Sequence, residues 1–222
     1  MSARNSAAKP GAFPWAGLLA LILAIGVSAF LLLTEVRPAA LLNTWYLTRA
    51  SGLVAFVLLW ASVALGLLQA TGLLKGVSAP AASLEIHQYV SVGALYATTF
   101  HAVILLWDHY IPFRLWDLLI PFGSSYKPLL VGPGSLGFYI ALLAAVTTYF
   151  RNKMNSKTWR ALHQFSLLGF FAAMIHGLAL GTDSNLWAVG FMYRFAFISV
   201  AVLLVARVLK GVAANANPAG RG

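Results

Sequence analysis

Six long apolar segments dominate this chain and limit what it can fold into. They cover roughly Trp15–Leu33, Leu47–Thr71, His87–Trp107, Leu136–Phe150, Trp159–Leu180 and Trp187–Leu209. Apolar runs of about 20 residues predict transmembrane helices, because a helix satisfies every backbone hydrogen bond within one segment. Only 9% of the residues are charged, which agrees with this interpretation. We expect an all-α integral membrane protein built as a six-helix transmembrane bundle.

The distribution of charge predicts how these helices are oriented. The net charge is +10, and with a cytoplasmic N-terminus ten of the fifteen basic residues fall on the cytoplasmic side. These ten are Arg4, Lys9, Lys75, Arg151, Lys153, Lys157, Arg160, Arg207, Lys210 and Arg221. This is the positive-inside pattern, so both termini are expected in the cytoplasm, and the basic surplus does not predict a nucleic-acid partner. The expected organisation is a tail over 1–14, a six-span domain over 15–210 and a tail over 211–222.

Four histidines lie inside the apolar segments in two evenly spaced pairs. His87 and His101 are 14 residues apart, and His163 and His176 are 13 apart. An ionisable side chain within a membrane span is costly and indicates a functional site. The expected topology pairs His87 with His163 near the cytoplasmic side and His101 with His176 near the outer side. Two imidazoles at each level suit an electron-transferring haem, and the two levels lie about 20 Å apart along the helices.

The two histidine spacings differ in helical phase. Fourteen residues return a helix to within about 40° of the starting face, whereas thirteen miss it by about 140°. We therefore expect the fifth segment to tighten locally, rotate or begin late, so that both of its histidines reach their partners. The chain has no cysteine, which excludes covalent haem attachment and iron–sulfur ligation within it. The sequence thus predicts two non-covalent haem b groups, each ligated by two histidines.

Five further residues are candidate cofactor contacts. Gly93 and Gly169 each follow a ligand histidine by six residues and would let a porphyrin approach the backbone, although helix packing in membranes favours glycine equally. Phe170 lies midway between the two histidines of its segment, where it either bridges two haems or packs in the core. Arg49 is expected to pair with a haem propionate or to snorkel to the interface. Arg194 lies seven residues inside its span, which favours an anionic partner such as a propionate.

The long connection over 108–135 is rich in aromatic residues and is expected on the outer side. Residues 114–120 are expected to form a short interfacial helix that covers the outer haem; the alternative is a surface loop anchored by its aromatic side chains. The fifth histidine, His109, also lies in this connection. It is either a solvated side chain or a contact for a metal or an electron acceptor.

Several short motifs around the histidines are those of a known membrane family. They are Trp45–Val54, the helix from His87 to His101, Tyr110–Phe113 with Pro121-Phe122, Trp159–His163, Ile175–Gly177 and Gly181–Ser184. Over residues 45–209 the chain resembles the ferric reductase-like transmembrane domain. That family includes NADPH oxidases, six-span metalloreductases and the haem subunit of periplasmic methionine sulfoxide reductase. The resemblance implies two b haems that pass electrons outward, with Arg49 beside the outer haem.

The sequence and the resemblance together predict a haem-binding electron-transfer subunit in a bacterial cytoplasmic (inner) membrane, surrounded by lipid. NADPH oxidases carry a flavin and nicotinamide domain after the last helix, whereas little of this sequence lies outside the predicted spans, so a flavin is expected only on a partner protein. The expected donor is a separate cytoplasmic flavin reductase or quinol. The expected acceptor is ferric iron, oxygen or a partner oxidoreductase on the outer face.

Two other functional classes remain open at this point. The chain is alternatively a haem carrier, or a histidine-lined proton pathway without redox function, although its few intramembrane acids disfavour the pathway. Within the electron-transfer class, a quinol-oxidising cytochrome b shares the 14-residue histidine spacing. The single helix expected between the two histidine-bearing segments disfavours that rival.

Overall fold

The computed structural model describes residues 44–74, 76, 79–108 and 110–216, and these form helices without a strand among them. The chain divides into two units, 1–36 and 37–222, and the described residues all belong to the second unit. The expected first span, His109 and the end of the C-terminal tail lie outside the described residues. The longer helices are α2 (Thr44–Thr71), α3 (Pro80–Ile104), α5 (Pro128–Tyr149), α6 (Ser156–Gln164), α7 (Ser166–Leu180) and α8 (Trp187–Ala216). The short ones are η2 (Leu105–Trp107), α4 (Leu115–Leu119) and η3 (Arg151–Lys153).

Five helical segments in the described part of the chain are long and apolar enough to cross a membrane. They are Thr44–Thr71, Pro80–Trp107, Pro128–Tyr149, Ser156–Leu180 and Trp187–Ala213. Many of their apolar side chains are exposed, and on α8 the side chains of Val202, Val205 and Val208 are each more than half exposed. Such surfaces indicate contact with membrane lipid, because exposing so many apolar side chains to water is unfavourable. The all-α prediction is confirmed for these five spans, whereas the sixth span and the orientation stay predictions.

Two of the spans begin earlier than the apolar pattern predicts. α3 begins at Pro80 rather than near His87, and α5 begins at Pro128 rather than near Leu136. A proline in the first turn is favourable, because its missing N–H group would have no intrahelical partner there. α5 also accommodates Pro133 in its interior. α3 extends beyond the apolar part of its span in a less apolar first turn, whereas α5 begins with the apolar residues Leu129, Leu130 and Val131 ahead of Pro133.

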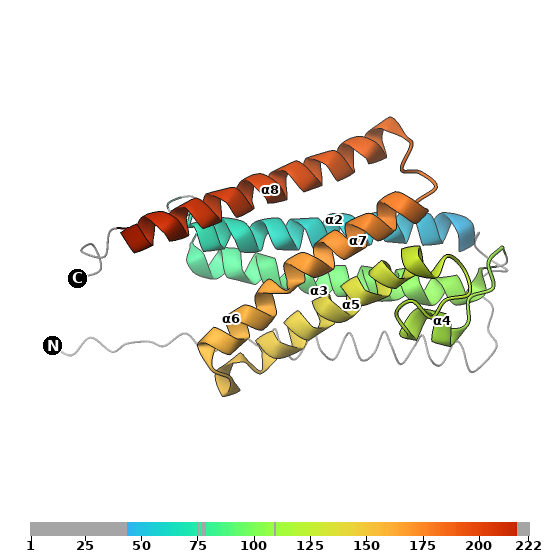
Figure 1. Ribbon diagram of the computed structural model, residues 1–222, viewed down its shortest axis with the longest axis horizontal. Helices are drawn as coiled ribbons and strands as arrows, with labels where there is room; N and C mark the ends of the chain where they lie inside the picture. Colours follow the sequence, from blue (N-terminus) through green and yellow to red (C-terminus); the bar gives the residue numbers. More distant parts are fainter. Residues whose placement is uncertain (1–43, 75, 77–78, 109, 217–222) are drawn as a thin grey trace. The chain divides into compact units, whose positions relative to one another are not determined.

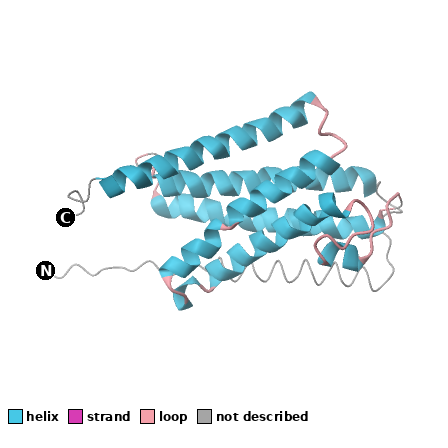
Figure 2. Cartoon of the chain, in the orientation of Figure 1, coloured by secondary structure: helices cyan, strands magenta, loops and turns pink. Residues whose placement is uncertain are grey.

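Helices α2 and α3 form an antiparallel pair, while α5 packs mainly against α7 and α8 packs mainly along α2 (Figure 1). Figure 2 shows that the connections are loops at the helix ends, the longest lying between α3 and α5. Trp60 Nε1 of α2 donates to Ser199 Oγ of α8 at 2.9 Å, and Lys210 Nζ of α8 donates to the Thr71 carbonyl of α2 at 2.6 Å. Both bonds join residues 139 apart in sequence, so α2 and α8 run parallel with a constant offset.

The fifth span is interrupted at Phe165, between α6 and α7. The Phe165 N–H group bonds to the Leu162 carbonyl three residues earlier, at 3.2 Å, instead of four residues earlier. Phe165 itself has φ −59° and ψ −19°, as expected for a tight 3₁₀-like turn. Of the three adjustments expected for this segment, the structure shows a local tightening between His163 and His176.

Candidate functional site: two histidine pairs

The four intramembrane histidines meet in the two pairs that their spacing predicts. The ring centroids of His87 and His163 are 6.1 Å apart, with an angle of 77° between the ring planes. The centroids of His101 and His176 are 6.3 Å apart, with an angle of 81°. In each pair one ring comes from α3 and the other from α6 or α7. The fold thus places two nearly identical imidazole pairs at two levels of the bundle.

The His101 ring packs against two residues of α2, the carbonyl of Thr48 and the glycine Gly52, and we call such a pair of positions the seat of a ring. Its Nδ1 lies 2.9 Å from the Thr48 carbonyl oxygen, and because a carbonyl only accepts, Nδ1 carries the proton. The ring also lies against Gly52, where an added Cβ would be 3.0 Å from its Cε1 atom. The backbone carbonyl fixes the tautomer, and the glycine four residues later provides the space for the ring.

A second seat of the same construction holds His87 one level away on α2. Its Nδ1 lies 3.0 Å from the Ser62 carbonyl, and a Cβ at Gly66 would lie 3.3 Å from its Cε1 atom. Ser62 and Gly66 follow the residues of the first seat, Thr48 and Gly52, by 14 residues each. This spacing equals the separation of the two histidines on α3. Each histidine of α3 therefore lies opposite one seat on the antiparallel helix α2.

Helix α5 provides the seat for His176 on the opposite side of the bundle. The His176 Nδ1 lies 2.9 Å from the Leu130 carbonyl, and a Cβ at Gly134 would lie only 2.7 Å from that nitrogen. The carbonyl and the glycine are again four residues apart. Three of the four histidines therefore have a protonated Nδ1 held by a backbone carbonyl.

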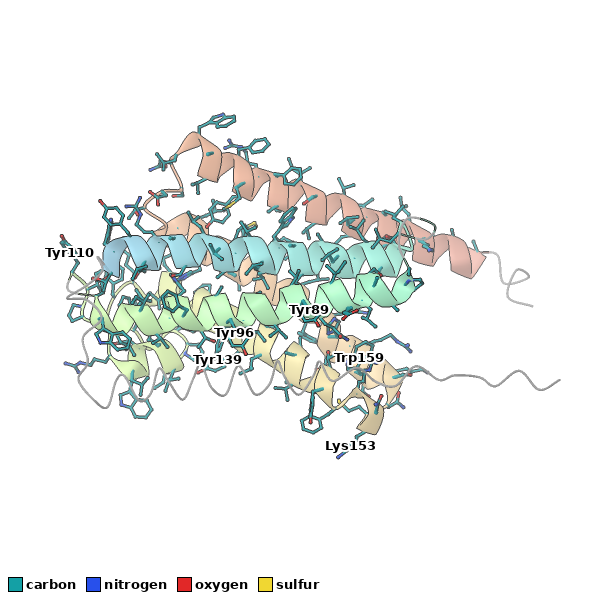
Figure 3. All side chains as sticks on the ribbon, turned by 180° about the vertical axis from the view of Figure 1, so that it is seen from behind. Tyr89, Tyr96, Tyr110, Tyr139, Lys153 and Trp159 are labelled. Atoms are coloured by element: carbon teal, nitrogen blue, oxygen red, sulfur yellow. The ribbon has the colours of Figure 1, made fainter. Side chains whose placement is uncertain are left out.

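The fourth seat, for His163, uses a side chain in place of a glycine. Thr148 Oγ1 donates to the Ala144 carbonyl at 2.7 Å, lies 3.3 Å from His163 Nδ1 and accepts from Trp159 Nε1 at 3.3 Å. Because the hydroxyl proton is used by Ala144, its oxygen is left to accept from the imidazole. The indole of Trp159 (labelled in Figure 3) also stacks on the His163 ring, with centroids 5.3 Å apart. Ala144 and Thr148 follow Leu130 and Gly134 by 14 residues.

The interruption of the fifth span lies between two histidines whose spacing differs from that of their seats. Seats on α5 are 14 residues apart, whereas the histidines that use them, His163 and His176, are 13 apart. The tight turn at Phe165 adds rotation in the sense that this difference requires, because a 3₁₀ turn rotates by about 120° per residue and an α-helix by about 100°.

The arrangement of the imidazoles fits an iron with two axial nitrogen ligands. With Nδ1 engaged at every seat, Nε2 is the nitrogen left to bind, as in metal-ligating histidines whose other nitrogen donates to a carbonyl. A metal–nitrogen bond of about 2.0 Å on each side, with ring centroids about 1.1 Å beyond each nitrogen, predicts about 6.2 Å between centroids. Both pairs have that separation. No group of three or more histidine or carboxylate side chains that could hold a metal ion occurs in the described segments.

The predicted glycine contacts fall elsewhere. Gly93 meets only Leu58, at an ordinary 3.7 Å from an added Cβ. Gly169 approaches the backbone of α5, where its added Cβ would lie 3.2 Å from the Gly137 carbonyl. Close approach of α5 and α7 therefore accounts for Gly169 without a cofactor. A role for either glycine beside a porphyrin stays a prediction.

Phe170 is fully buried, with 0% of its surface exposed. Its ring stacks on Phe56 of α2 at a centroid distance of 5.8 Å, and Phe56 in turn contacts Tyr193 of α8 at 4.5 Å. Phe170 thus belongs to the core where α2, α7 and α8 meet. Its bridging role between two haems is not tested by these contacts.

Arg49 pairs with a carboxylate of the protein itself. Its Nε donates to Asp183 Oδ2 at 2.7 Å and its Nη2 donates to the other carboxylate oxygen, which makes a bidentate ion pair. This pair joins the first turns of α2 to the loop between α7 and α8, directly beside Thr48 of the His101 seat. A propionate at this position would share Arg49 with Asp183.

Arg194 lies on the exposed surface of α8, and its predicted pairing with a propionate stays a prediction. Its side chain is exposed, and its guanidinium lies along the helix beside Gly190, with Nη1 3.3 Å from an added Cβ there. No carboxylate among the described residues pairs with Arg194. The side chain extends toward the start of α8, as a snorkelling arginine does, because it lies on a face that does not pack in the bundle.

The connection between α3 and α5 contains the expected short helix, α4. Tyr139 of α5 donates its hydroxyl to the Leu119 carbonyl at 2.6 Å, which ties the end of α4 to α5. Phe122 has a left-handed φ of 65°, and its ring packs directly on Gly132 in the space that a side chain at that position would need. These contacts fix the loop two residues before Gly134, next to the His176 seat. His109 lies outside the described residues, so its predicted contact role is not addressed.

Sequence reasoning found the four rings but missed their seats. The three glycines that admit the rings are Gly52, Gly66 and Gly134, and the signal was the 14-residue repeat shared with the histidines of α3. On α2 each glycine lies four residues after the residue whose carbonyl accepts from the imidazole, and this pair of positions repeats after 14 residues.

Comparison with known proteins identifies a family without a known activity. A family model described as Domain of unknown function (DUF8596) matches residues 43–183, which include α2 to α7, all four histidines and all four seats. Neither the curated proteins nor the solved structures contain a match. Because the match covers well over half of the chain, the protein belongs to the family of the domain of unknown function DUF8596.

Proposed function

We propose that this protein is a membrane cytochrome that binds two haem b groups and transfers electrons across the bilayer. His87 with His163 would ligate one iron, and His101 with His176 the other. The observation that carries the proposal is that both imidazole pairs have Nδ1 engaged and ring centroids at the separation that an iron with two axial nitrogens requires. Each haem would supply a reversible ferric–ferrous couple.

The residues of the seats would tune and protect the two groups. A carbonyl that accepts from Nδ1–H increases the electron donation of Nε2, which favours the ferric state of a ligated iron. The seats on α2 and α5 hold the rings from opposite sides, so that reorganisation on electron transfer stays small. Two histidines holding each iron would leave no open position for a substrate. These properties support electron transfer over chemistry at the iron itself.

The direction of transfer rests on the charge pattern. With the cytoplasm on the side where α2 ends, the His87–His163 pair is the inner site and the His101–His176 pair the outer site. Four exposed cations, Arg151, Lys153, Lys157 and Arg160, then lie on the cytoplasmic side close to His163 in sequence. They support encounter with an acidic donor protein such as a flavin reductase, with quinol as the other donor.

The motifs shared with the ferric reductase-like transmembrane domain support the same function. In that family two b haems lie on the third and fifth spans, as proposed here. By this reasoning the acceptor is ferric iron, oxygen or a partner oxidoreductase on the outer face. The location that fits is a bacterial inner membrane.

Haem quantification on the purified chain tests the proposal. A reduced-minus-oxidised spectrum with haem counted per chain should give two b haems for the wild type and one for His101→Ala. His109→Ala, which removes a histidine outside the spans, is the matched control and should keep two. A wild-type chain purified from haem-replete cells without stoichiometric haem would refute the proposal. Substoichiometric haem that is readily exchanged would favour a haem carrier instead.

A further inference from the structure

Helix α8 carries two arginines within its membrane span, and they lie on different faces. Arg194 is exposed, whereas Arg207 is half-buried. Arg207 follows the fully buried Val200 by seven residues and the buried Tyr193 by 14, or two and four helical turns. Residues at these spacings share one face of a helix. Arg207 therefore lies on the face of α8 that packs toward the bundle.

Arg207 also lies at the same height along the helix axes as the His87–His163 pair. With the constant offset of 139 residues between the parallel helices, Arg207 lies opposite Leu68 of α2. Leu68 is about half a turn from Gly66, on which the His87 ring rests. The Arg207 guanidinium lies within electrostatic range of the His163 imidazole. The register with α2 thus places this charge level with the His87–His163 site, and its phase on α8 directs it toward the bundle.

A charge in this position requires an anionic partner. Burying a guanidinium inside a membrane span is costly unless it is paired. In the part of the chain that the structure describes, the only ion pair joins Arg49 to Asp183, at the other end of α2. Glu85, near the start of α3, is exposed. The imidazoles of the site are neutral ligands and provide no negative charge.

We propose that Arg207 is the anion-binding residue of the His87–His163 site, where it binds a carboxylate of the ligand that the two histidines hold. For a haem this carboxylate is a propionate, which a guanidinium binds through two parallel hydrogen bonds. The inference rests on the proposed function and deepens it, because it assigns a ligand contact to a helix that provides no histidine.

Reconstitution with two haems that differ only in their carboxylates tests the contact. The full-length His101→Ala chain, prepared without haem in nanodiscs, reports on the His87–His163 site alone. It is titrated with haem b and with haem dimethyl ester, whose propionates are esterified. The parent chain should prefer haem b by about tenfold or more, and Arg207→Gln should lose both that affinity and that preference. Arg194→Gln removes the same charge from the same helix and should retain both, while Arg207→Lys should recover part of the preference.

The outcomes separate this inference from the proposed function. If Arg207→Gln binds haem b but keeps the preference over the ester, the inference is wrong and the proposed function stands. If Arg207→Gln weakens both ligands equally, Arg207 has a structural role or binds a lipid phosphate, and the inference is again wrong. If the parent chain binds neither ligand while the wild type contains no haem, the proposed function itself fails.

Discussion

The seat at Gly134 allows the sharpest test of how the fold positions its histidines. A Cβ at this position would lie 2.7 Å from Nδ1, 2.8 Å from Cε1 and 2.9 Å from Cγ of His176. Carbon atoms normally stay about 3.5 Å or more apart, so Gly134→Ala must displace the ring by several tenths of an ångström. Overpacking of this kind costs about 1–3 kcal/mol, which corresponds to roughly a tenfold to hundredfold weaker site.

The same substitution should not damage the helix. Replacing glycine by alanine inside a helix stabilises it by about 1 kcal/mol, so the loss should be confined to the site. We expect purified Gly134→Ala to fold, with unchanged helical circular dichroism, and to lose haem from the His101–His176 site. Gly93→Ala is the matched control, because its added Cβ meets only Leu58 at 3.7 Å. Two haems per chain and an unchanged low-spin spectrum in Gly134→Ala would refute the reasoning.

Two other predictions concern side-chain contacts. Thr148→Val removes the hydroxyl that lies 3.3 Å from His163 Nδ1, so the midpoint potential of the haem at His163 should shift while that of the other haem does not; potentiometric titration measures this, and equal shifts of both would contradict it. Arg49→Gln breaks the bidentate pair with Asp183, whose side chains are 31% and 16% exposed, and should lower stability by about 1 kcal/mol. Thermal unfolding in detergent measures the stability lost in each variant. The Arg49→Gln, Asp183→Asn double variant should lose little more stability than either single variant, whereas additive losses would show that the two side chains do not interact.

The histidine pairing could be predicted because two independent constraints agree. The spacing on each segment and the shared direction of the segments leave one way to bring four rings into two pairs. Helical phase also predicts that the fifth segment tightens, rotates or begins late, since a regular helix cannot direct His163 and His176 to one side. These properties depend on the sequence of one helix at a time.

The seats and the arginines depend on how different helices pack, and the sequence of one helix does not contain that. α2 and α8 are apolar on all faces, so hydropathy has no period that shows which side is buried. Arg194 is a candidate from the sequence because of its depth in the span, but the structure places Arg207, not Arg194, on the packed face of α8. The buried Tyr193 and Val200 identify this face, and the Trp60 and Lys210 hydrogen bonds give the register between α2 and α8.

Electron paramagnetic resonance of the oxidised, full-length protein tests the central claim most directly. The imidazole planes cross at 77° and 81°, and nearly perpendicular axial imidazoles keep two iron d orbitals close in energy. The account predicts two highly anisotropic low-spin ferric signals, one of which disappears in His101→Ala. A high-spin signal from iron with a single axial ligand, or the rhombic signal of parallel imidazole planes, would contradict it.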